Sequence, residues 1–292
     1  MIPEAIVNFV NRQNRTHYIL LPDRLCGESG QSALLTDQKR DRYYLKWGRG
    51  EEFNSKRALR IVRTLRGRGY PASEFILRGD YRRDEFTIQK PLPGRKVVTL
   101  TNQLIIGILA LNDLQKGAAR QLDGDWPNDI VKSLREGSPE WCLHKSLETY
   151  SAETRGILDE IRRLGDASVP KRIPATDAVH WDFSVPNLLR QRDTISGVFD
   201  WEGCRKGDRG FDLVTLAFYS LERPSTARRL LDHAHSISGA RAVAFYLAHM
   251  VLRQLDWSIR HDDQVEIQRY LKIARRAMET VRDLADKQRG PS

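Results

Sequence analysis

Three oxygen-bearing side chains in the middle of the chain have a spacing that could support transfer of a phosphoryl group. Asp182 is followed five residues later by Asn187 and thirteen residues after that by Asp200, and His180 completes the pattern H-x-D-x4-N. Phosphoryl transfer needs a carboxylate beside the attacking hydroxyl and oxygen ligands for the magnesium ion that neutralises the phosphates; this pattern with a later aspartate provides both. The spacing predicts Asp182 at the reacting hydroxyl, with Asn187 and Asp200 at Mg²⁺.

Each of these residues also has an ordinary structural interpretation. The histidine could belong to the core, Asp182 and Asn187 could occupy turns, and Asp200 could end a strand. The complete ordered pattern is expected by chance in roughly one chain of this size in a hundred, from ordinary residue frequencies. An apolar strand candidate at residues 195–199 ends directly before Asp200. The combination favours the catalytic interpretation.

The segments before this window predict a small lobe rich in β-strands. Short β-prone runs alternate with polar turns and flank one amphipathic helix. The strand candidates are residues 34–36, 43–47, 74–77 and 85–89, and the helix candidate is residues 51–68. Pro91 and Gly94 then interrupt the chain, because proline fixes φ and lacks an N–H donor. We therefore expect an N-terminal lobe over residues 1–90 and a hinge at residues 88–95.

The remainder, residues 91–292, predicts a larger and mainly helical lobe. Apolar residues recur at helical intervals in a segment that begins at Thr101, at residues 147–164 and at residues 225–286. Polar, loop-rich sequence is expected at residues 117–139.

Composition and charge exclude several classes of protein. Hydrophobic residues make up 40% and charged residues 29% of the chain, as in folded globular proteins rather than disordered ones. The net charge of +10 would suit a nucleic-acid partner, but acidic residues are interleaved with the basic ones and no platform of aromatic and basic residues is found. We therefore expect an anionic small ligand, such as a nucleotide triphosphate, and no nucleic acid.

The sequence predicts a cytoplasmic protein without a membrane partner, as a monomer or a homodimer. The first residues lack the basic start and apolar run of a signal peptide, and no window approaches the ~20 apolar residues of a membrane span. The three cysteines, Cys26, Cys142 and Cys204, are far apart and outside any CxxC pattern. Neither a disulfide framework nor a zinc site is indicated.

Further short motifs follow the catalytic pattern at fixed distances. They are Asp200-Trp201-Glu202, Gly207-Asp208 and Asp212-Leu213. With the H-x-D-x4-N pattern, these motifs resemble the aminoglycoside phosphotransferase and choline kinase superfamily. The resemblance implies an α+β, protein-kinase-like two-lobed fold, with a small antiparallel-sheet N-terminal lobe that carries one helix and a larger, mainly helical C-terminal lobe. It also implies an enzyme that uses ATP or GTP with Mg²⁺ to phosphorylate a hydroxyl group of a small molecule.

The same resemblance assigns roles to residues around the catalytic pattern. Asp182 would orient the substrate hydroxyl and accept its proton, and His180 would be a scaffold for the loop. Asp208 and Asp212 would brace that loop through hydrogen bonds, with a substrate-facing Asp208 left open.

Lys46 is the candidate for contact with the nucleotide phosphates. It lies at the centre of a strand-like run, where a buried lysine would be costly without an anionic partner; the alternative is a lysine on the surface of a sheet. Ser29 and Ser32 lie in the preceding loop and could cover the phosphates, although a plain hairpin turn would look the same.

Two further predictions concern the nucleotide. The family usually places a glutamate inside the helix after the lysine strand, where this chain has Arg57 and Ala58. Glu52, at the helix start, is therefore the predicted partner of the lysine. Gln89 and Lys90 in the hinge are predicted to read the purine edge through their backbone groups.

The superfamily places the acceptor against the helices of the large lobe. Candidates there are Asp256, Trp257, Asp262, Asp263 and Glu266, and a surface loop joining two helices is the alternative interpretation. A net charge of +10 does not indicate the acidic pocket that a polycationic aminoglycoside would need. We expect a small hydroxylated natural product or antibiotic, inactivated by phosphorylation so that resistance results.

Three alternatives remain open from the sequence. The enzyme could be a metabolic kinase for a sugar, an amino alcohol or a nucleoside. The chain could instead be a catalytically silent kinase-like binding module or a basic RNA-binding protein.

Overall fold

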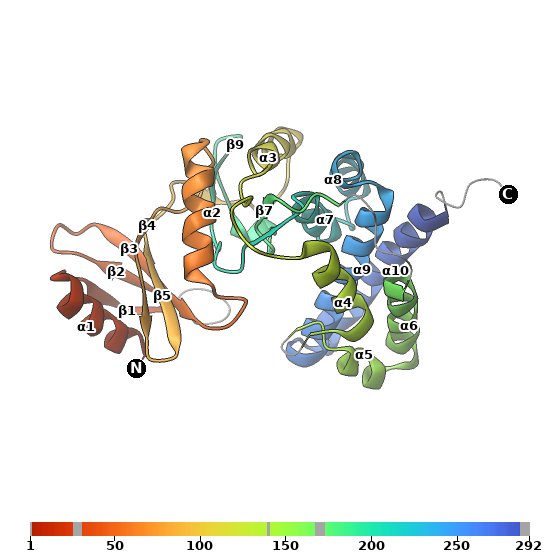
Figure 1. The fold of residues 1–292 in the computed structure, drawn as a ribbon, viewed down its shortest axis with the longest axis horizontal. Coiled ribbons are helices and arrows are strands. Elements are labelled where there is room, and N and C mark those ends of the chain that lie inside the picture. Colours follow the sequence, from red (N-terminus) through yellow and green to blue (C-terminus); the bar gives the residue numbers. More distant parts are fainter. Residues whose placement is uncertain (1, 26–30, 139–140, 167–172, 287–292) are drawn as a thin grey trace. The chain divides into compact units, whose positions relative to one another are not determined.

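The computed structural model describes residues 2–25, 31–138, 141–166 and 173–286, which form two compact units (Figure 1). We call Met1–Leu114 with Val185–Arg205 the sheet unit, and Gln115–Ser184 with Lys206–Ser292 the helical unit. The lobe boundary expected at residues 88–95 stays a prediction, because these units are defined by packing and not by a hinge motion.

The sheet unit is built on a five-stranded antiparallel sheet with the order β1-β2-β3-β5-β4. Its strands are β1 (Ile19–Leu25), β2 (Ser32–Thr36), β3 (Arg42–Gly48), β4 (Phe75–Tyr81) and β5 (Asp84–Gln89). Its helices are α1 (Ile2–Asn14) and α2 (Ser55–Gly67), and α2 packs on β4 and β5. The strands predicted at residues 34–36, 43–47, 74–77 and 85–89 lie within or overlap β2, β3, β4 and β5.

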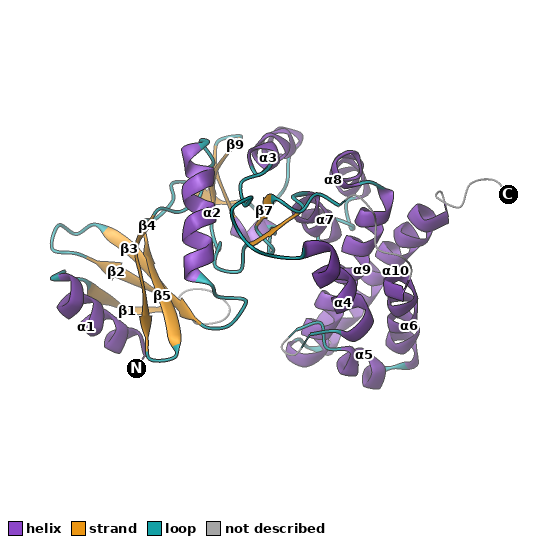
Figure 2. Ribbon diagram, viewed as in Figure 1, coloured by secondary structure: helices purple, strands orange, loops and turns teal. Residues whose placement is uncertain are grey.

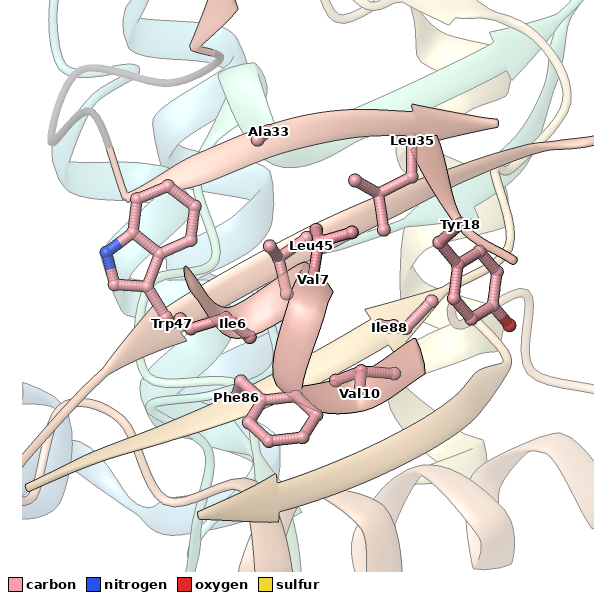
Figure 3. Close-up of a cluster of buried hydrophobic side chains, with 10 residues drawn as sticks. All are labelled: Ile6, Val7, Val10, Tyr18, Ala33, Leu35, Leu45, Trp47, Phe86 and Ile88. Carbon is pink, nitrogen blue, oxygen red and sulfur yellow. The ribbon is translucent and has the colours of Figure 1, made fainter. Parts of the chain in front are cut away.

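Helix α1 lays its apolar side chains on one face of this sheet. Ile6, Val7 and Val10 join a buried cluster with strand residues that include Leu45 and Phe86 (Figure 3). Successive side chains of a strand point to opposite faces of the sheet. Because odd-numbered residues of β3 and even-numbered residues of β5 face α1, their neighbours must project from the other face.

Helix α1 and strand β1 are additions to the predicted order of strand, strand, helix, strand, strand. The helix has a sequence signal that is short but readable. Pro3 lies in the first turn, where a missing N–H costs nothing, and Ile6, Val7 and Val10 follow at helical spacing. Pro22 weakens the strand signal of β1 because proline is disfavoured inside sheets.

The sheet unit also contains a small three-stranded sheet and a helix. These elements are β6 (Arg95–Lys96), β8 (Leu188–Gln191) and β9 (Thr194–Val198), in the order β6-β8-β9, with α3 (Asn102–Leu114) and the 3-10 turn η1 (Val185–Asn187). Strands β8 and β9 form an antiparallel hairpin directly after the catalytic pattern.

The helical unit is almost entirely helical (Figure 2). Its helices are α4 (Trp126–Glu136), α5 (His144–Tyr150), α6 (Ala152–Asp166), α7 (Gly210–Phe218), α8 (Pro224–Ser238), α9 (Ala240–His261) and α10 (Gln264–Asp286). Two short strands, β7 (Asp177–Val179) and β10 (Arg205–Gly207), pair with each other. Helix α9 is the core element, since its residues from Ala242 to Leu252 are all buried.

One prediction about helices in this unit was wrong. The segment at residues 117–139, expected to be polar and rich in loops, contains α4, which starts after Asp125 with a proline in its first turn. Polar residues on its exposed side hid the apolar side. The helical sequence predicted at residues 147–164 is confirmed, and it forms two helices because the backbone is extended at Ser151. Among the described residues, no helix is long and apolar enough to cross a membrane.

Candidate active site

The β8–β9 hairpin brings the two predicted metal ligands to the same end of one small sheet. Asn187 directly precedes β8, and Asp200 follows β9 after one residue. Leu188 pairs with Val198, and the Phe199 N–H donates to the Asn187 carbonyl at 3.2 Å. A carboxamide and a carboxylate, separated by twelve residues in the sequence, thus leave neighbouring backbone positions within one compact unit.

Asp200 has a backbone conformation that few residue types adopt readily. Its φ is 71°, in the left-handed region where aspartate and asparagine are enriched among non-glycine residues. Its side chain is 50% exposed, whereas Asn187 is buried. Both groups offer the hard oxygen donors that Mg²⁺ prefers, and Mg²⁺ is commonly held by one or two protein carboxylates together with phosphates and water. The donor set therefore fits the predicted ion.

Lys46 lies on the face of the sheet opposite α1 and makes two ion pairs. Its Nζ is 2.7 Å from Asp200 Oδ1 and 3.1 Å from Glu202 Oε2. Burial by itself lowers the pKa of this lysine, but the Glu202 and Asp200 carboxylates outweigh it and raise the pKa above its ordinary value. The ammonium group is therefore charged, and the interpretation of Lys46 as a lysine on the open sheet surface is wrong.

The predicted pairing of Lys46 with Glu52 is wrong as well. Glu52 Oε1 accepts a hydrogen bond from Arg205 Nη2 at 2.8 Å. Glu52 lies in an exposed turn before α2, and the guanidinium satisfies its carboxylate there. Any contact of Glu52 with nucleotide stays a prediction.

Glu202 is the functional candidate that sequence reasoning missed. Its side chain is 2% exposed, and Oε1 accepts hydrogen bonds from Thr87 Oγ1 at 3.2 Å and from Gln89 Nε2. Thr87 pairs with Lys46 across the β3–β5 ladder, and Gln89 is two residues further along β5. The side chains of Lys46, Thr87 and Gln89 therefore project from the same face of the sheet. The sequence does show a glutamate two residues after Asp200, but spacing alone does not indicate that it pairs with Lys46.

Backbone groups of the residues predicted to contact the purine pair with neighbouring backbone in the sheet unit. Strand β5 lies between β3 and β4, and Gln89 pairs with Tyr44 on one side and Phe75 on the other. The Lys90 N–H donates to the Glu74 carbonyl at 3.0 Å. The expectation that the Lys90 N–H contacts the base is therefore wrong, and contact of the base with the other backbone groups of Gln89 and Lys90 stays a prediction. The Gln89 side chain donates a hydrogen bond to Glu202.

The structure describes only one of the two serines predicted to cover the phosphates. Ser29 lies outside the described residues. Ser32 is the first residue of β2, where it pairs with Lys46 across the ladder. That position is next to the lysine on the neighbouring strand, and its contact with phosphate stays a prediction.

In the helical unit, Asp212 holds the backbone of the catalytic pattern. Its carboxylate accepts hydrogen bonds from the His180 N–H at 2.8 Å and the Trp181 N–H at 3.1 Å, and from Gln115 Nε2 at 2.6 Å. Burial raises the pKa of Asp212 to about 6. These hydrogen bonds fix the backbone of the two residues directly before Asp182, so Asp212 has a positioning role.

Arg253, on α9, is a second positioning group that sequence reasoning missed. Its Nη1 donates to the Trp181 carbonyl at 2.8 Å, and its Nη2 is 3.4 Å from Asp182 Oδ1. The guanidinium also lies 5.3 Å from the centre of the Trp181 ring. Asp182 is 42% exposed, so its carboxylate is oriented while part of its surface stays accessible. Arg253 lies 71 residues further along the chain, which explains why spacing gave no signal.

Asp208 is a structural anchor in this unit. It is fully buried, and it accepts hydrogen bonds from the Gly210 N–H at 2.9 Å and the Tyr246 hydroxyl at 2.8 Å. Tyr246 in turn accepts one from Trp126 Nε1 at 2.9 Å. Burial raises the pKa of Asp208. The alternative in which Asp208 faces the substrate is wrong, because its two oxygens face the interior of the helical unit.

The predicted acceptor residues form the junction between α9 and α10. Asp263 Oδ1 accepts from the backbone N–H groups of Val265 at 2.9 Å and Glu266 at 3.0 Å, which caps α10. The Glu266 carboxylate pairs with Arg269 at 3.1 Å. Asp262 ends α9. Asp263 and Glu266 thus interact with neighbouring groups of α10, and their role in binding the phosphate acceptor stays a prediction.

Trp257 is the other acceptor candidate at this junction. It is 49% exposed, and its ring stacks on His261 with ring centres 4.1 Å apart. An exposed aromatic pair could contact a ligand, and that role also stays a prediction. Asp256, the residue before Trp257, is buried and pairs with Arg260 at 2.9 Å, so the expectation that it lines an acceptor site is wrong.

The pKa of Asp212 gives the free energy of unfolding a defined pH dependence. Its folded pKa of about 6 lies above the ordinary value of 3.8, so the folded state binds the proton more tightly than the unfolded state. Stability from this group is present below pH 4 and is lost as the pH rises to 6. We expect the difference in free energy of unfolding between wild type and Asp212→Asn to shrink over that interval, measured by chemical denaturation. A difference that is constant from pH 4 to pH 7 would contradict this assignment.

Comparisons with known proteins identify the family and the fold. A family model described as "Phosphotransferase enzyme family" matches residues 27–246. No curated protein sequence matches the chain. The fold is similar to that of a thermostable mutant of the aminoglycoside phosphotransferase APH(4)-Ia in a ternary complex with AMP-PNP and hygromycin B, with a TM-score of 0.66 and 16% identity over 94% of this chain and 97% of that chain.

Two other solved structures show the same fold. The choline kinase LicA from Streptococcus pneumoniae has a TM-score of 0.63 and 15% identity over 97% of this chain and 99% of that chain. The amicoumacin kinase hAmiN, in complex with AMP-PNP, Ca²⁺ and Ami, has a TM-score of 0.60 and 14% identity over 97% of this chain and 96% of that chain. The expected α+β, kinase-like fold class and the superfamily resemblance are confirmed.

Proposed function

Because the chain belongs to the phosphotransferase enzyme family and is an enzyme of the small-molecule kinase type, we propose that it moves the γ-phosphate of ATP or GTP to a hydroxyl group of a hydroxylated natural product or antibiotic. The observation that carries the proposal is the ion-paired cluster of Lys46, Asp200 and Glu202. Asn187 lies in the same compact unit, where its carbonyl accepts from the N–H of the residue before Asp200. A partly buried ammonium group beside an accessible carboxylate suits a ligand that carries both phosphate and a divalent cation.

Each residue of this cluster has a distinct proposed role. Asn187 and Asp200 would hold Mg²⁺, which when bound neutralises charge on the phosphates. Lys46 would contact the phosphates with its ammonium group. These residues bind and orient the donor, and none of them needs to react covalently.

Asp182 is the proposed base for the acceptor. Its carboxylate accepts the proton of the substrate hydroxyl as that oxygen bonds to the γ-phosphorus. The bond from the γ-phosphorus to the β–γ bridging oxygen breaks, and ADP or GDP leaves. Because the transition state of phosphoryl transfer is loose, orientation of the hydroxyl matters as much as its deprotonation. The ion pair with Arg253 supports this role because it orients the Asp182 carboxylate. The hydrogen bonds that Asp212 accepts from the His180 and Trp181 N–H groups hold the preceding backbone in place.

Antibiotic inactivation is the proposed consequence. A phosphate on a hydroxyl adds negative charge and bulk to a ligand that must fit a complementary target. Expression of the gene in a susceptible host should then raise the growth-inhibiting concentration of the antibiotic that the enzyme modifies.

The proposal is tested by incubating the purified protein with Mg²⁺ and either ATP or GTP, together with a panel of hydroxylated antibiotics, sugars, amino alcohols and nucleosides. Mass spectrometry of the acceptors should show the gain of one phosphate on a compound of the antibiotic class. A gain confined to the sugars, amino alcohols or nucleosides would identify a metabolic kinase instead. Nucleotide binding without a phosphorylated product on any acceptor would indicate a silent binding module.

A further inference from the structure

Helix α2 contains no residue that could serve as the acidic partner of Lys46. Its thirteen residues, Ser55–Gly67, read SKRALRIVRTLRG, with five basic and no acidic side chains. Its buried side is formed by Ser55, Ala58, Ile61, Val62 and Leu65. In kinase-like sites the strand lysine requires a carboxylate that fixes its direction toward the phosphates. That carboxylate must come from another element.

We propose that Glu202, from the segment after β9, is the positioning residue that orients Lys46 toward the nucleotide phosphates. The inference rests on the proposed function for the existence of a nucleotide ligand. Beyond that function, it assigns the orientation of Lys46 to Glu202, which follows Asp200 in the sequence, and not to a residue of α2.

The two carboxylate oxygens of Glu202 have separate tasks. Oε2 faces the ammonium group of Lys46 at 3.1 Å. Oε1 accepts hydrogen bonds from Thr87 and Gln89 on β5. Gln89 Nε2 also donates to Thr87 Oγ1 at 2.9 Å, so the two β5 side chains hold each other. One oxygen is thereby fixed to the sheet, and the other presents a constant direction to the lysine.

Burial separates Glu202 from the second partner of Lys46. Glu202 is 2% exposed, whereas Asp200 is 50% exposed and lies in a left-handed backbone conformation. A carboxylate enclosed by donors cannot turn toward an incoming ligand without leaving those donors unsatisfied. An accessible carboxylate can turn. Lys46 therefore has one permanent partner in Glu202 and one exchangeable partner in Asp200.

The variant Glu202→Gln isolates the oxygen that faces Lys46. Glutamine has the same shape and keeps one oxygen as acceptor for Thr87 and Gln89. It replaces the other oxygen with an NH₂ donor, which cannot accept from the ammonium group of Lys46. We expect the affinity for Mg·ATP, or for Mg·GTP if the wild type prefers it, to fall at least about tenfold, as for loss of a partner that orients a ligand-binding group. The KM of the phosphate acceptor should be unchanged.

A double-mutant cycle distinguishes positioning from general structure. Lys46→Met removes the group through which Glu202 acts, so Glu202→Gln should cause no further loss of nucleotide affinity in a Lys46→Met background. Asp80→Asn is the matched control, because this exposed aspartate of β4 lies in the same unit, pairs with Arg78 and has no predicted role at the nucleotide. It should bind nucleotide like the wild type. Thermal unfolding of each variant establishes that it is folded.

The inference is overturned if Glu202→Gln binds nucleotide like the wild type while Lys46→Met is impaired. It is also overturned if the two losses add in full. If Glu202→Gln does not fold, Thr87→Val removes one of the donors that fix Glu202, and unchanged nucleotide affinity in that variant overturns the inference. A wild-type protein that binds neither Mg·ATP nor Mg·GTP would instead contradict the proposed function itself.

Discussion

Replacing Asp182 by alanine should lower kcat by about 10²- to 10⁴-fold, the usual contribution of a positioned acid or base. The affinity for Mg-nucleotide should change little, because Lys46, Asn187 and Asp200 are untouched in the other unit. The loss arises because the acceptor hydroxyl has neither a proton acceptor nor an oriented hydrogen-bond partner. Initial rates of phosphorylation and a nucleotide titration on the same preparation measure the two effects separately.

Asp193 provides the control for this experiment. It is an exposed aspartate between β8 and β9, and Asp193→Ala should phosphorylate the acceptor at the wild-type rate. If Asp182→Ala transfers phosphate as fast as the wild type, the base has been assigned to the wrong residue. If the variant instead loses nucleotide affinity as well, Asp182 contributes to donor binding.

Replacing Asp200 by asparagine should have the opposite signature. Asparagine is the suitable change because it tolerates the left-handed backbone conformation at this position, where φ is 71°. It removes the negative charge and one of the oxygens that could bind Mg²⁺. We expect the affinity for nucleotide in the presence of Mg²⁺ to fall by at least about 10- to 100-fold, the loss that follows removal of even an outer partner of a metal site. Calorimetric titration with and without Mg²⁺ checks this.

The metal dependence is the decisive part of that measurement. In the wild type, Mg²⁺ should strengthen nucleotide binding, and in Asp200→Asn this increment should be largely absent. A variant that keeps the full increment would show that the ion is held by other residues. Asp182→Ala again serves for comparison, since it should keep the increment.

The local pattern of the sequence predicted the parts of the fold that depend on near neighbours. Strands β3 and β5 and helix α2 follow from short-range alternation and from helical spacing. The helical period at residues 147–164 predicted helical sequence there, but it does not show that one extended residue, Ser151, divides the segment into two helices. The helix α4 was missed because its polar residues dominate the composition of the segment, although its apolar side is buried.

The candidate site was predictable to the extent that its residues are close in sequence. Asp182, Asn187 and Asp200 stand in one window of nineteen residues, and spacing alone indicates them. Glu202 and Arg253 have roles that depend on which distant strand or helix lies opposite. Thr87 meets Glu202 across 115 positions of the chain, and no local pattern encodes such a pairing.

The placement of both acidic partners on one short segment affects how such an enzyme could be regulated. Protein kinases can be switched off by moving the helix that carries the lysine's glutamate, without disturbing the metal-binding aspartate. Here Asp200 and Glu202 are separated by a single residue, and the corresponding helix has no carboxylate to withdraw. Movement of α2 would remove neither acidic partner of Lys46, so it could not inactivate this enzyme by breaking the ion pairs of the lysine. Separating Lys46 from its partners would instead require a change in the segment after β9, which carries both carboxylates.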